Sequence, residues 1–488
     1  MKREFLINIS LLLVINILVK PLYLIGVDAH IQNLVGPETY GVYFALFNLV
    51  FMMQVIIEPG IQSYNSKTIA QNPDSLGHHL PNILGIKSVL LVLFIGAVVA
   101  AFYLSGYSSD LLQLTIILAV NLFLSTTYIF LRTNIAAIGK YRWDSFLSAL
   151  DKVLMLIILG TLSWLPSLRD QFTIMWLVYG QLAAYLISCA VAFTILLRHL
   201  GSLRLAISWS YFRTLIKASY PFILILLFMS LYNKMDGLML ERMLGDNGLE
   251  AGIYAAGYRL VDALNMLGYL MAGLLLPMYS SNVDNARVIA DLLYTGLRVM
   301  TVCAILGACV FVFFGADILP LIYDDTTPYY AEVLTVLMLS FVGVSVAYLY
   351  GTLLVAKGKL LHLNILLFTS VIVNLLLNYY LIPIHYAVGA ATATVITQGL
   401  VMLGQILIVH TVVQVPVQWL AYGKACLFAI TAILVFYATA QLSHWHWISQ
   451  VLVALCLCTI AAFITKLIDI KALLGLVKNR ATNADNRN

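Results

Sequence analysis

Charged side chains inside apolar segments are the residues of this sequence that could do chemistry. Lys20, Lys234 and Arg259 lie within runs long enough to cross a membrane, and Asp236 and Asp262 lie close behind two of them. A charge near the centre of a bilayer costs roughly 2.5 to 3.5 kcal/mol, so each should face a cavity, an opposite charge, or both. Three cations and two carboxylates form a set that could carry an anionic headgroup.

A polar stripe continues through the apolar run that holds Arg259. Tyr258, Asp262, Asn265 and Tyr269 recur at the spacing of one helical face, with Arg259 alongside. Hydrogen-bonding groups mixed with aromatic rings suit a sugar or a phosphate headgroup. The alternative is that Arg259 and Asp262 neutralise each other as buried structural ions between helices.

Other charged residues have structural interpretations. The long stem of Lys20 would let its ammonium reach the outer interface instead of a ligand. Glu58 could bind a coupling ion or reach water at the inner surface, and we expect the water. Asp151 and Lys152 are expected to join helices rather than to bind a ligand.

The composition indicates that transmembrane helices position these side chains. The chain has 488 residues, 62% hydrophobic and 10% charged, with a mean hydropathy of +0.95, whereas a soluble domain is about 25% charged. This excludes a soluble globular enzyme and predicts an all-α polytopic membrane protein with about 14 transmembrane helices. The predicted spans are 5–26, 40–62, 84–106, 111–132, 145–165, 172–197, 219–242, 250–277, 291–316, 330–356, 360–383, 388–410, 421–441 and 447–467.

The distribution of basic residues predicts the orientation. Of 27 Lys and Arg residues, all but Lys20, Arg169, Lys234, Arg242 and Arg259 fall at inner ends when the N-terminus is cytoplasmic. The positive-inside rule therefore places both termini in the cytoplasm. The net charge of +5 is too small and dispersed for a nucleic-acid surface. We interpret the first apolar run as an uncleaved helix rather than a signal peptide.

Motifs of ATP-driven or hydrolytic chemistry do not occur in the sequence. There is no Walker loop, GxSxG, HExxH or paired CxxC, and no predicted loop is long enough for a catalytic domain. The six cysteines lie in apolar runs, where a thiol behaves as a small hydrophobe. We expect no enzymatic activity, disulfide, cofactor or metal.

A weak internal repeat predicts the organisation of the chain. Three pairs recur at nearly one offset, namely GVY at 41–43 with GIY at 252–254, TNIAAIGK at 133–140 with TLLVAKGK at 352–359, and Gln181 with Gln398. Six predicted spans separate equivalent positions, so the copies share an orientation and a cavity is expected between two six-helix lobes. The predicted regions are an N-terminal lobe at 1–205, a C-terminal lobe at 206–412, and two further helices with a basic tail at 413–488.

Four longer segments carry a family resemblance. They are LVGPETYGVYFAL at 34–46, KMDGLMLERMLGDNGLEAGIYAAGYRLVDAL at 234–264, LLVAKGK at 353–359 and NLLLNYYLIPIHYAVGAATAT at 374–394. With them the sequence resembles the polysaccharide transporter, or O-antigen flippase, family. Its superfamily also holds multidrug-and-toxin exporters and lipid II flippases.

The resemblance implies a function and a set of site residues. It implies two lobes around a V-shaped cavity in the bacterial cytoplasmic membrane. Alternating access would move an undecaprenyl-diphosphate-linked oligosaccharide from the inner to the outer leaflet for surface polysaccharide synthesis. Lys20, Lys234 and Arg259 would meet the diphosphate, with Asp262 as an acidic partner. A polysaccharide polymerase or glycosyltransferases would be protein partners.

Three other functions remain open at this point. A drug or cation antiporter of the same superfamily predicts twelve spans and a cavity dominated by carboxylates. An O-antigen polymerase or ligase predicts a large outer loop with catalytic Arg or His residues. A scaffold without transport would leave the intramembrane charges unexplained.

Overall fold

The computed structural model describes residues 18–62, 65, 69, 76–200, 208–442, 444–465 and 467. These residues form helices and connecting turns, and no β-strand occurs among them. The predicted all-α fold is therefore confirmed. Contacts divide the chain into two compact units, Met1–Gly252 and Ile253–Asn488, here called unit 1 and unit 2. The lobe boundaries predicted from the repeat stay a prediction.

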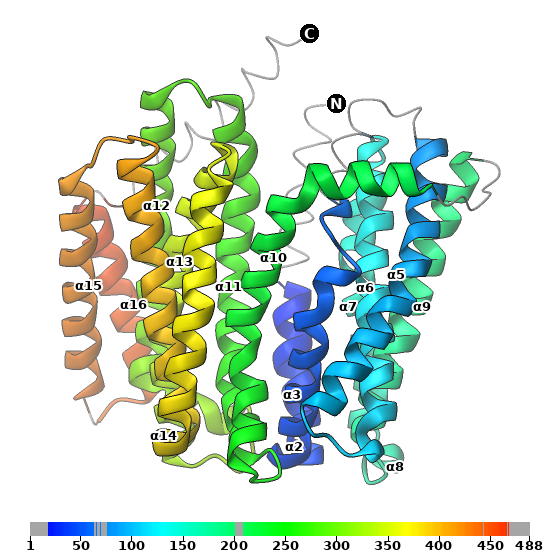
Figure 1. Cartoon of the computed structure of the whole chain (residues 1–488). Coiled ribbons are helices and arrows are strands. Elements are labelled where there is room, and N and C mark those ends of the chain that lie inside the picture. Colours follow the sequence, from blue (N-terminus) through cyan, green and yellow to red (C-terminus); the bar gives the residue numbers. More distant parts are fainter. Residues whose placement is uncertain are drawn as a thin grey trace. The chain divides into compact units, whose positions relative to one another are not determined.

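Unit 1 holds the elements up to the start of α11 (Figure 1). They are η1 (Leu24–Asp28), α2 (Ala29–Val35), α3 (Pro37–Met52), η2 (Met53–Ile56), α5 (Leu76–Leu104), η4 (Ser109–Leu111), α6 (Leu112–Ala137), α7 (Tyr141–Trp164), α8 (Pro166–Arg169), α9 (Ile174–Leu200) and α10 (Trp209–Leu244). Unit 2 holds α11 (Leu249–Ser281) from Ile253 onward, α12 (Ala286–Ile318), η5 (Leu319–Leu321), α13 (Pro328–Ala356), α14 (Leu360–Thr411), α15 (Trp419–Ala440) and α16 (Trp447–Ile464).

Twelve helices of the described part are long and apolar enough to cross a membrane. One of them, α14, is interrupted at Tyr386, whose φ of 52° and ψ of −130° are not helical, and it covers two predicted spans. The first predicted span is described only from residue 18. The chain is therefore a multi-pass membrane protein, and the described helices are compatible with the predicted fourteen spans.

The helix that carries Lys20 changes its winding one turn further on. Residues 18–23 are α-helical, and η1 continues as a π-helix in which the Ala29 amide donates to the Leu24 carbonyl. Pro21, which has no amide to donate, lies just before this segment. Asp28 at its end is buried and accepts a 2.7 Å hydrogen bond from Tyr40 Oη. Single π-helical turns are frequent at functional sites.

The break after α3 is held by a buried ion pair, which corrects the prediction that Glu58 reaches water. Glu58 is 8% exposed and its Oε2 lies 2.8 Å from Lys87 Nζ on α5. Lys87 also donates to the Ile57 carbonyl, and Glu58 Oε1 accepts from the Gln62 amide. A charge pair satisfied on both sides can stay inside the protein. The sequence did not reveal the pair because Lys87 lies 29 residues away.

The glycines of the GVY and GIY motifs allow a close backbone approach inside unit 1. A Cβ on Gly41 would lie 1.8 Å from the Gly248 carbonyl oxygen, and one on Gly252 would lie 2.0 Å from the Pro37 carbonyl oxygen. Only glycine fits at such distances. These glycines fix the start of α11 against α3, and Gln32 strengthens the contact by donating to the Gly252 carbonyl at 3.0 Å.

Candidate functional site

In unit 1, Lys20 lies near Asp151 and Lys152 of α7. The charges of Asp151 and Lys152 act on Lys20 most strongly. Within the described residues, Lys20 itself forms no ion pair. The lysine predicted to bind an anion thus lies near a second lysine that had been expected only to join helices.

Lys152 is surrounded by aromatic rings. Its Nζ lies 5.1 Å from the centre of the Tyr23 ring and 5.7 Å from that of Tyr185. The same atom is 3.6 Å from Asp151 Oδ2 and 3.5 Å from Met155 Sδ. Ring faces attract a cation, and the attraction grows where water is excluded. The first helix, α7 and α9 together hold this ammonium in place.

An amide on α9 joins two of the tyrosines. Gln181 Nε2 donates to Tyr23 Oη at 3.4 Å and to Tyr43 Oη at 3.3 Å. Gln181 and Tyr185 are four residues apart on α9 and therefore share one face. Hydroxyl and amide groups next to lysine ammoniums can bind phosphate oxygens as well as sugar hydroxyls.

Of the three cations Lys20, Arg132 and Lys152, only Lys20 has no carboxylate partner among the described residues. Arg132 Nη2 on α6 lies 3.1 Å from Asp144 Oδ1, and Lys152 lies beside Asp151. Both of these cations thus have an acidic partner, whereas Lys20 has none among the described residues. The arrangement is suited to an anion, because an unpaired cation in a membrane span needs an opposite charge.

Lys234 and Asp236 have different surroundings on α10. Lys234 Nζ lies 5.4 Å from the centre of the Phe51 ring on α3 and remains partly exposed. Asp236 is 1% exposed. A Cβ on Gly237 would lie 2.3 Å from Asn48 Nδ2, so α10 packs tightly on α3 at this depth. Lys234 is therefore partly exposed beside an aromatic ring, whereas Asp236 is buried.

The end of α10 beyond these residues is fastened to the turn after α5. Tyr107 Oη donates to Glu241 Oε2 at 2.6 Å, and Arg242 donates to both Glu241 oxygens. Arg242 also lies 4.1 Å from the centre of the Tyr107 ring. Burial and the Glu241 charge raise the pKa of Tyr107, so its hydroxyl stays a donor. This cluster joins the end of α10 to the turn after α5.

The stripe of unit 2 begins at two stacked tyrosines. Tyr258 is 8% exposed, and its ring centre lies 5.7 Å from that of Tyr254. Tyr254 Oη lies 3.1 Å from Thr394 Oγ1 on α14. Tyr254 belongs to the GIY motif, and Tyr43 of GVY likewise meets a polar side chain, on α9. The two copies of the motif make comparable contacts in their own units.

Arg259 and Asp262 do not neutralise each other. Within the described residues, Asp262 forms no ion pair, so the interpretation as a self-compensated structural pair fails. Of the charged and polar groups around Tyr348 of α13, Asp262 has the largest electrostatic influence on it, followed by Tyr269. Tyr348 packs on Gly268, where an added Cβ would meet its ring at 2.4 Å. Tyr348 therefore joins the predicted stripe.

Two members of the stripe have unused binding capacity. Asn265 Oδ1 is buried and has no hydrogen-bond partner among the described residues. Tyr269, one helical turn further on, is 70% exposed. A buried acceptor without a partner costs free energy, and a bound ligand or water would remove this cost.

Sequence reasoning missed Lys152, Tyr23, Tyr185 and Tyr348 as site residues. Lys152 lies eleven residues into α7, and a lysine so far inside an apolar run was the available signal. The tyrosines gave no signal, because their positions follow from how the helices pack. The structure brings Lys20 and Lys152 together in unit 1, and Tyr258, Asp262, Asn265 and Tyr269 onto α11 in unit 2.

Residues 5–283 match the family described as "Polysaccharide biosynthesis protein". No curated protein matches the chain significantly.

Solved structures with the same fold include flippases and exporters. The lipid II flippase MurJ in an inward closed conformation has a TM-score of 0.69 at 13% identity, covering 93% of this chain and 98% of MurJ. An inward-facing multidrug resistance MATE family transporter of the MOP superfamily has a TM-score of 0.58 at 12% identity, covering 84% and 99%. The MATE transporter VcmN of Vibrio cholerae has a TM-score of 0.58 at 13% identity, covering 83% and 97%.

Proposed function

Since the chain belongs to the polysaccharide biosynthesis protein family, we propose that it is a flippase for a polyprenyl-diphosphate-linked oligosaccharide. In this proposal the cargo moves from the inner to the outer leaflet of a bacterial cytoplasmic membrane during the synthesis of a surface polysaccharide such as O-antigen. Both termini would be cytoplasmic. A polymerase that extends the delivered oligosaccharide would be a partner.

The observation that carries the proposal is the cation set of unit 1. Lys20 has no carboxylate partner within the described residues, and Lys152 beside it is fixed by the Tyr23 and Tyr185 rings. A diphosphate could bind these ammonium groups by charge-assisted hydrogen bonds. Without such partners, a phosphate or sugar group would cost several kcal/mol in hydrocarbon.

Unit 2 would supply the groups for the sugar residues. Asn265 has an unused carbonyl and Tyr269 is exposed on the same face of α11. Arg259 would add a further contact to the diphosphate, as would Lys234 from α10. Alternating access of the lobes would expose these groups to each leaflet in turn while the polyprenyl tail stays in lipid.

The first experiment is deletion of the gene followed by mass spectrometry of membrane lipids. The proposal predicts that a polyprenyl-diphosphate oligosaccharide accumulates and that surface glycan is lost. Expression of the wild-type chain should reverse both effects. An unchanged lipid pool would contradict the proposal.

An antiporter for drugs or cations is the second candidate, because MATE transporters share the fold. A cationic cargo would need a site dominated by carboxylates, whereas Lys20 and Lys152 with Asp151 form a set with an excess of positive charge. Increased drug sensitivity of the deletion strain, with an unchanged lipid pool, would select the antiporter.

A further inference from the structure

The first turns of α10 differ from the rest of that helix. The candidate span begins only at Ser219, although the helix begins at Trp209. Figure 1 shows this part of α10 crossing the ends of other unit 1 helices before the helix turns into its span. Pro221 lies inside the helix at the turn, where a missing hydrogen bond allows a kink.

One face of this segment is fixed on the protein. Leu215 is fully buried in a cluster with residues of α5, α6 and α9, and Phe212 and Ile216 pack against that cluster. Ser219 is 4% exposed and packs on the backbone at Gly60. The position of the segment is therefore set by unit 1 itself.

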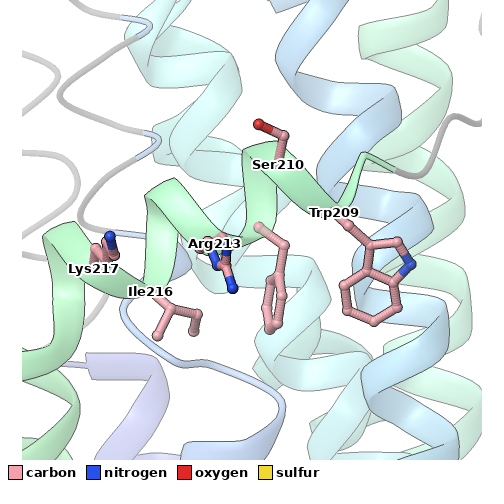
Figure 2. A pocket seen from close by; sticks show the side chains of 6 residues that line it. Trp209, Ser210, Arg213, Ile216 and Lys217 are labelled. Carbon is pink, nitrogen blue, oxygen red and sulfur yellow. The ribbon is translucent and has the colours of Figure 1, made fainter.

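The neighbouring face carries uncovered aromatic rings. Trp209 is 66% exposed and Tyr220 is 60% exposed. Figure 2 shows Trp209 and Arg213 on one side of the helix and Ser210 on the opposite side. Trp and Tyr with this exposure are typical of the zone where hydrocarbon meets lipid headgroups.

Two basic residues lie beside the exposed rings of Trp209 and Tyr220. Arg213 and Lys217 are exposed and one helical turn apart, and neither forms an ion pair within the described residues. The sequence has no carboxylate between Asp170 and Asp236. Among the described residues, a hollow of about 560 Å³ is lined by Trp209, Ser210, Phe212, Arg213, Ile216 and Lys217.

We propose that residues 209–220 bind the phosphate groups of anionic phospholipids at the surface of the membrane. Arg213 and Lys217 hold the phosphates while Trp209 and Tyr220 lie at headgroup depth, with the long basic side chains reaching along the apolar surface. Basic side chains attract an anionic leaflet, and the positive-inside rule assigns this end of the spans to the cytoplasm. A water-soluble acidic partner would not account for exposed aromatic rings next to the start of a span.

The test measures which lipid lies next to Trp209 in the full chain. The chain is placed in phosphatidylcholine nanodiscs that contain equal fractions of brominated phosphatidylglycerol or brominated phosphatidylcholine, since bromine quenches nearby tryptophan. The signal of Trp209 is the difference between the chain and its Trp209→Phe variant. Brominated phosphatidylglycerol should associate at least about fivefold more strongly, which is the contribution of one basic residue near an anionic surface.

A charge-matched pair of variants separates local binding from a general effect of charge. Arg213→Gln/Lys217→Gln should bring the two lipids to equal quenching. Arg198→Gln/Arg287→Gln removes two exposed cations from the ends of α9 and α12 and should leave the preference unchanged.

Three results would overturn the inference. They are equal quenching by both lipids in the wild type, no quenching by either, and an unchanged preference in Arg213→Gln/Lys217→Gln. The assay contains no polyprenyl lipid, so its outcome does not depend on the proposed cargo.

Discussion

The two units present different chemistry. In unit 1, Lys20 and Lys152 provide positive charge, and tyrosine rings and an adjacent carboxylate hold one of them in place. In unit 2, one face of α11 offers the exposed Tyr269 and the unused carbonyl of Asn265. In the proposed function, this difference would let unit 1 bind the diphosphate and unit 2 the sugars.

The shared part of the two units is the contact made by the repeated tyrosine. Tyr43 accepts a hydrogen bond from Gln181, and Tyr254 lies 3.1 Å from Thr394, one turn before Gln398. The polar residues around these contacts differ between the two units. The predicted repeat would therefore account for where the two candidate sites lie, but not for which groups they would bind.

The largest loss is expected for Arg259→Ala. In the proposed function its guanidinium contacts the diphosphate, so removing it should abolish flipping while the protein level stays near normal. Surface glycan and lipid-linked precursor in a complemented deletion strain give the readout. Arg169→Ala, on the exposed helix α8, is the control and should have no effect. Loss of the Arg259→Ala protein from the membrane would show a structural role instead.

Lys152→Met tests whether unit 1 binds the diphosphate. Loss of one partner of a desolvated charge contact costs roughly 2 kcal/mol or more, which is about 30-fold in rate. Initial flipping rates in proteoliposomes measure it. Asp151→Asn should keep or raise the rate, because it removes only negative charge. Equal loss in both variants would mean that the pair serves packing.

Lys20→Ala separates ligand binding from an extension of the side chain to the interface. About a tenfold loss of flipping is expected, since Lys152 remains nearby to bind the anion. Lys20→Gln should behave like Lys20→Ala if charge is what matters. Unaffected surface polysaccharide in both variants would favour the interfacial interpretation.

Tyr269→Ala is expected to have the smallest effect. The side chain is 70% exposed and buries little in the protein, so thermal stability should not change, while transport falls a few-fold through loss of sugar contacts. A shortened oligosaccharide should be less affected than the full one. An equal loss for both cargoes would argue against a sugar site in unit 2.

The sequence predicted the helical class and the membrane-spanning character, because an apolar run of about 20 residues can cross a bilayer only with its backbone hydrogen bonds satisfied, as in a helix. It also placed Tyr258, Asp262, Asn265 and Tyr269 on one face, since helical spacing is a local property. The neighbours of Lys152 and the pairing of Glu58 with Lys87 depend on contacts between distant helices. A single sequence carries no direct record of such contacts.

The most direct test of the central claim is a flipping assay in proteoliposomes with a polyprenyl-diphosphate oligosaccharide in one leaflet. The wild-type chain should equilibrate the lipid between leaflets, and Arg259→Ala and Lys152→Met should both slow this strongly. A phospholipid of similar chain length with a zwitterionic headgroup should not be moved. Equilibration at the wild-type rate by both variants would contradict a role for these cations in carrying the diphosphate.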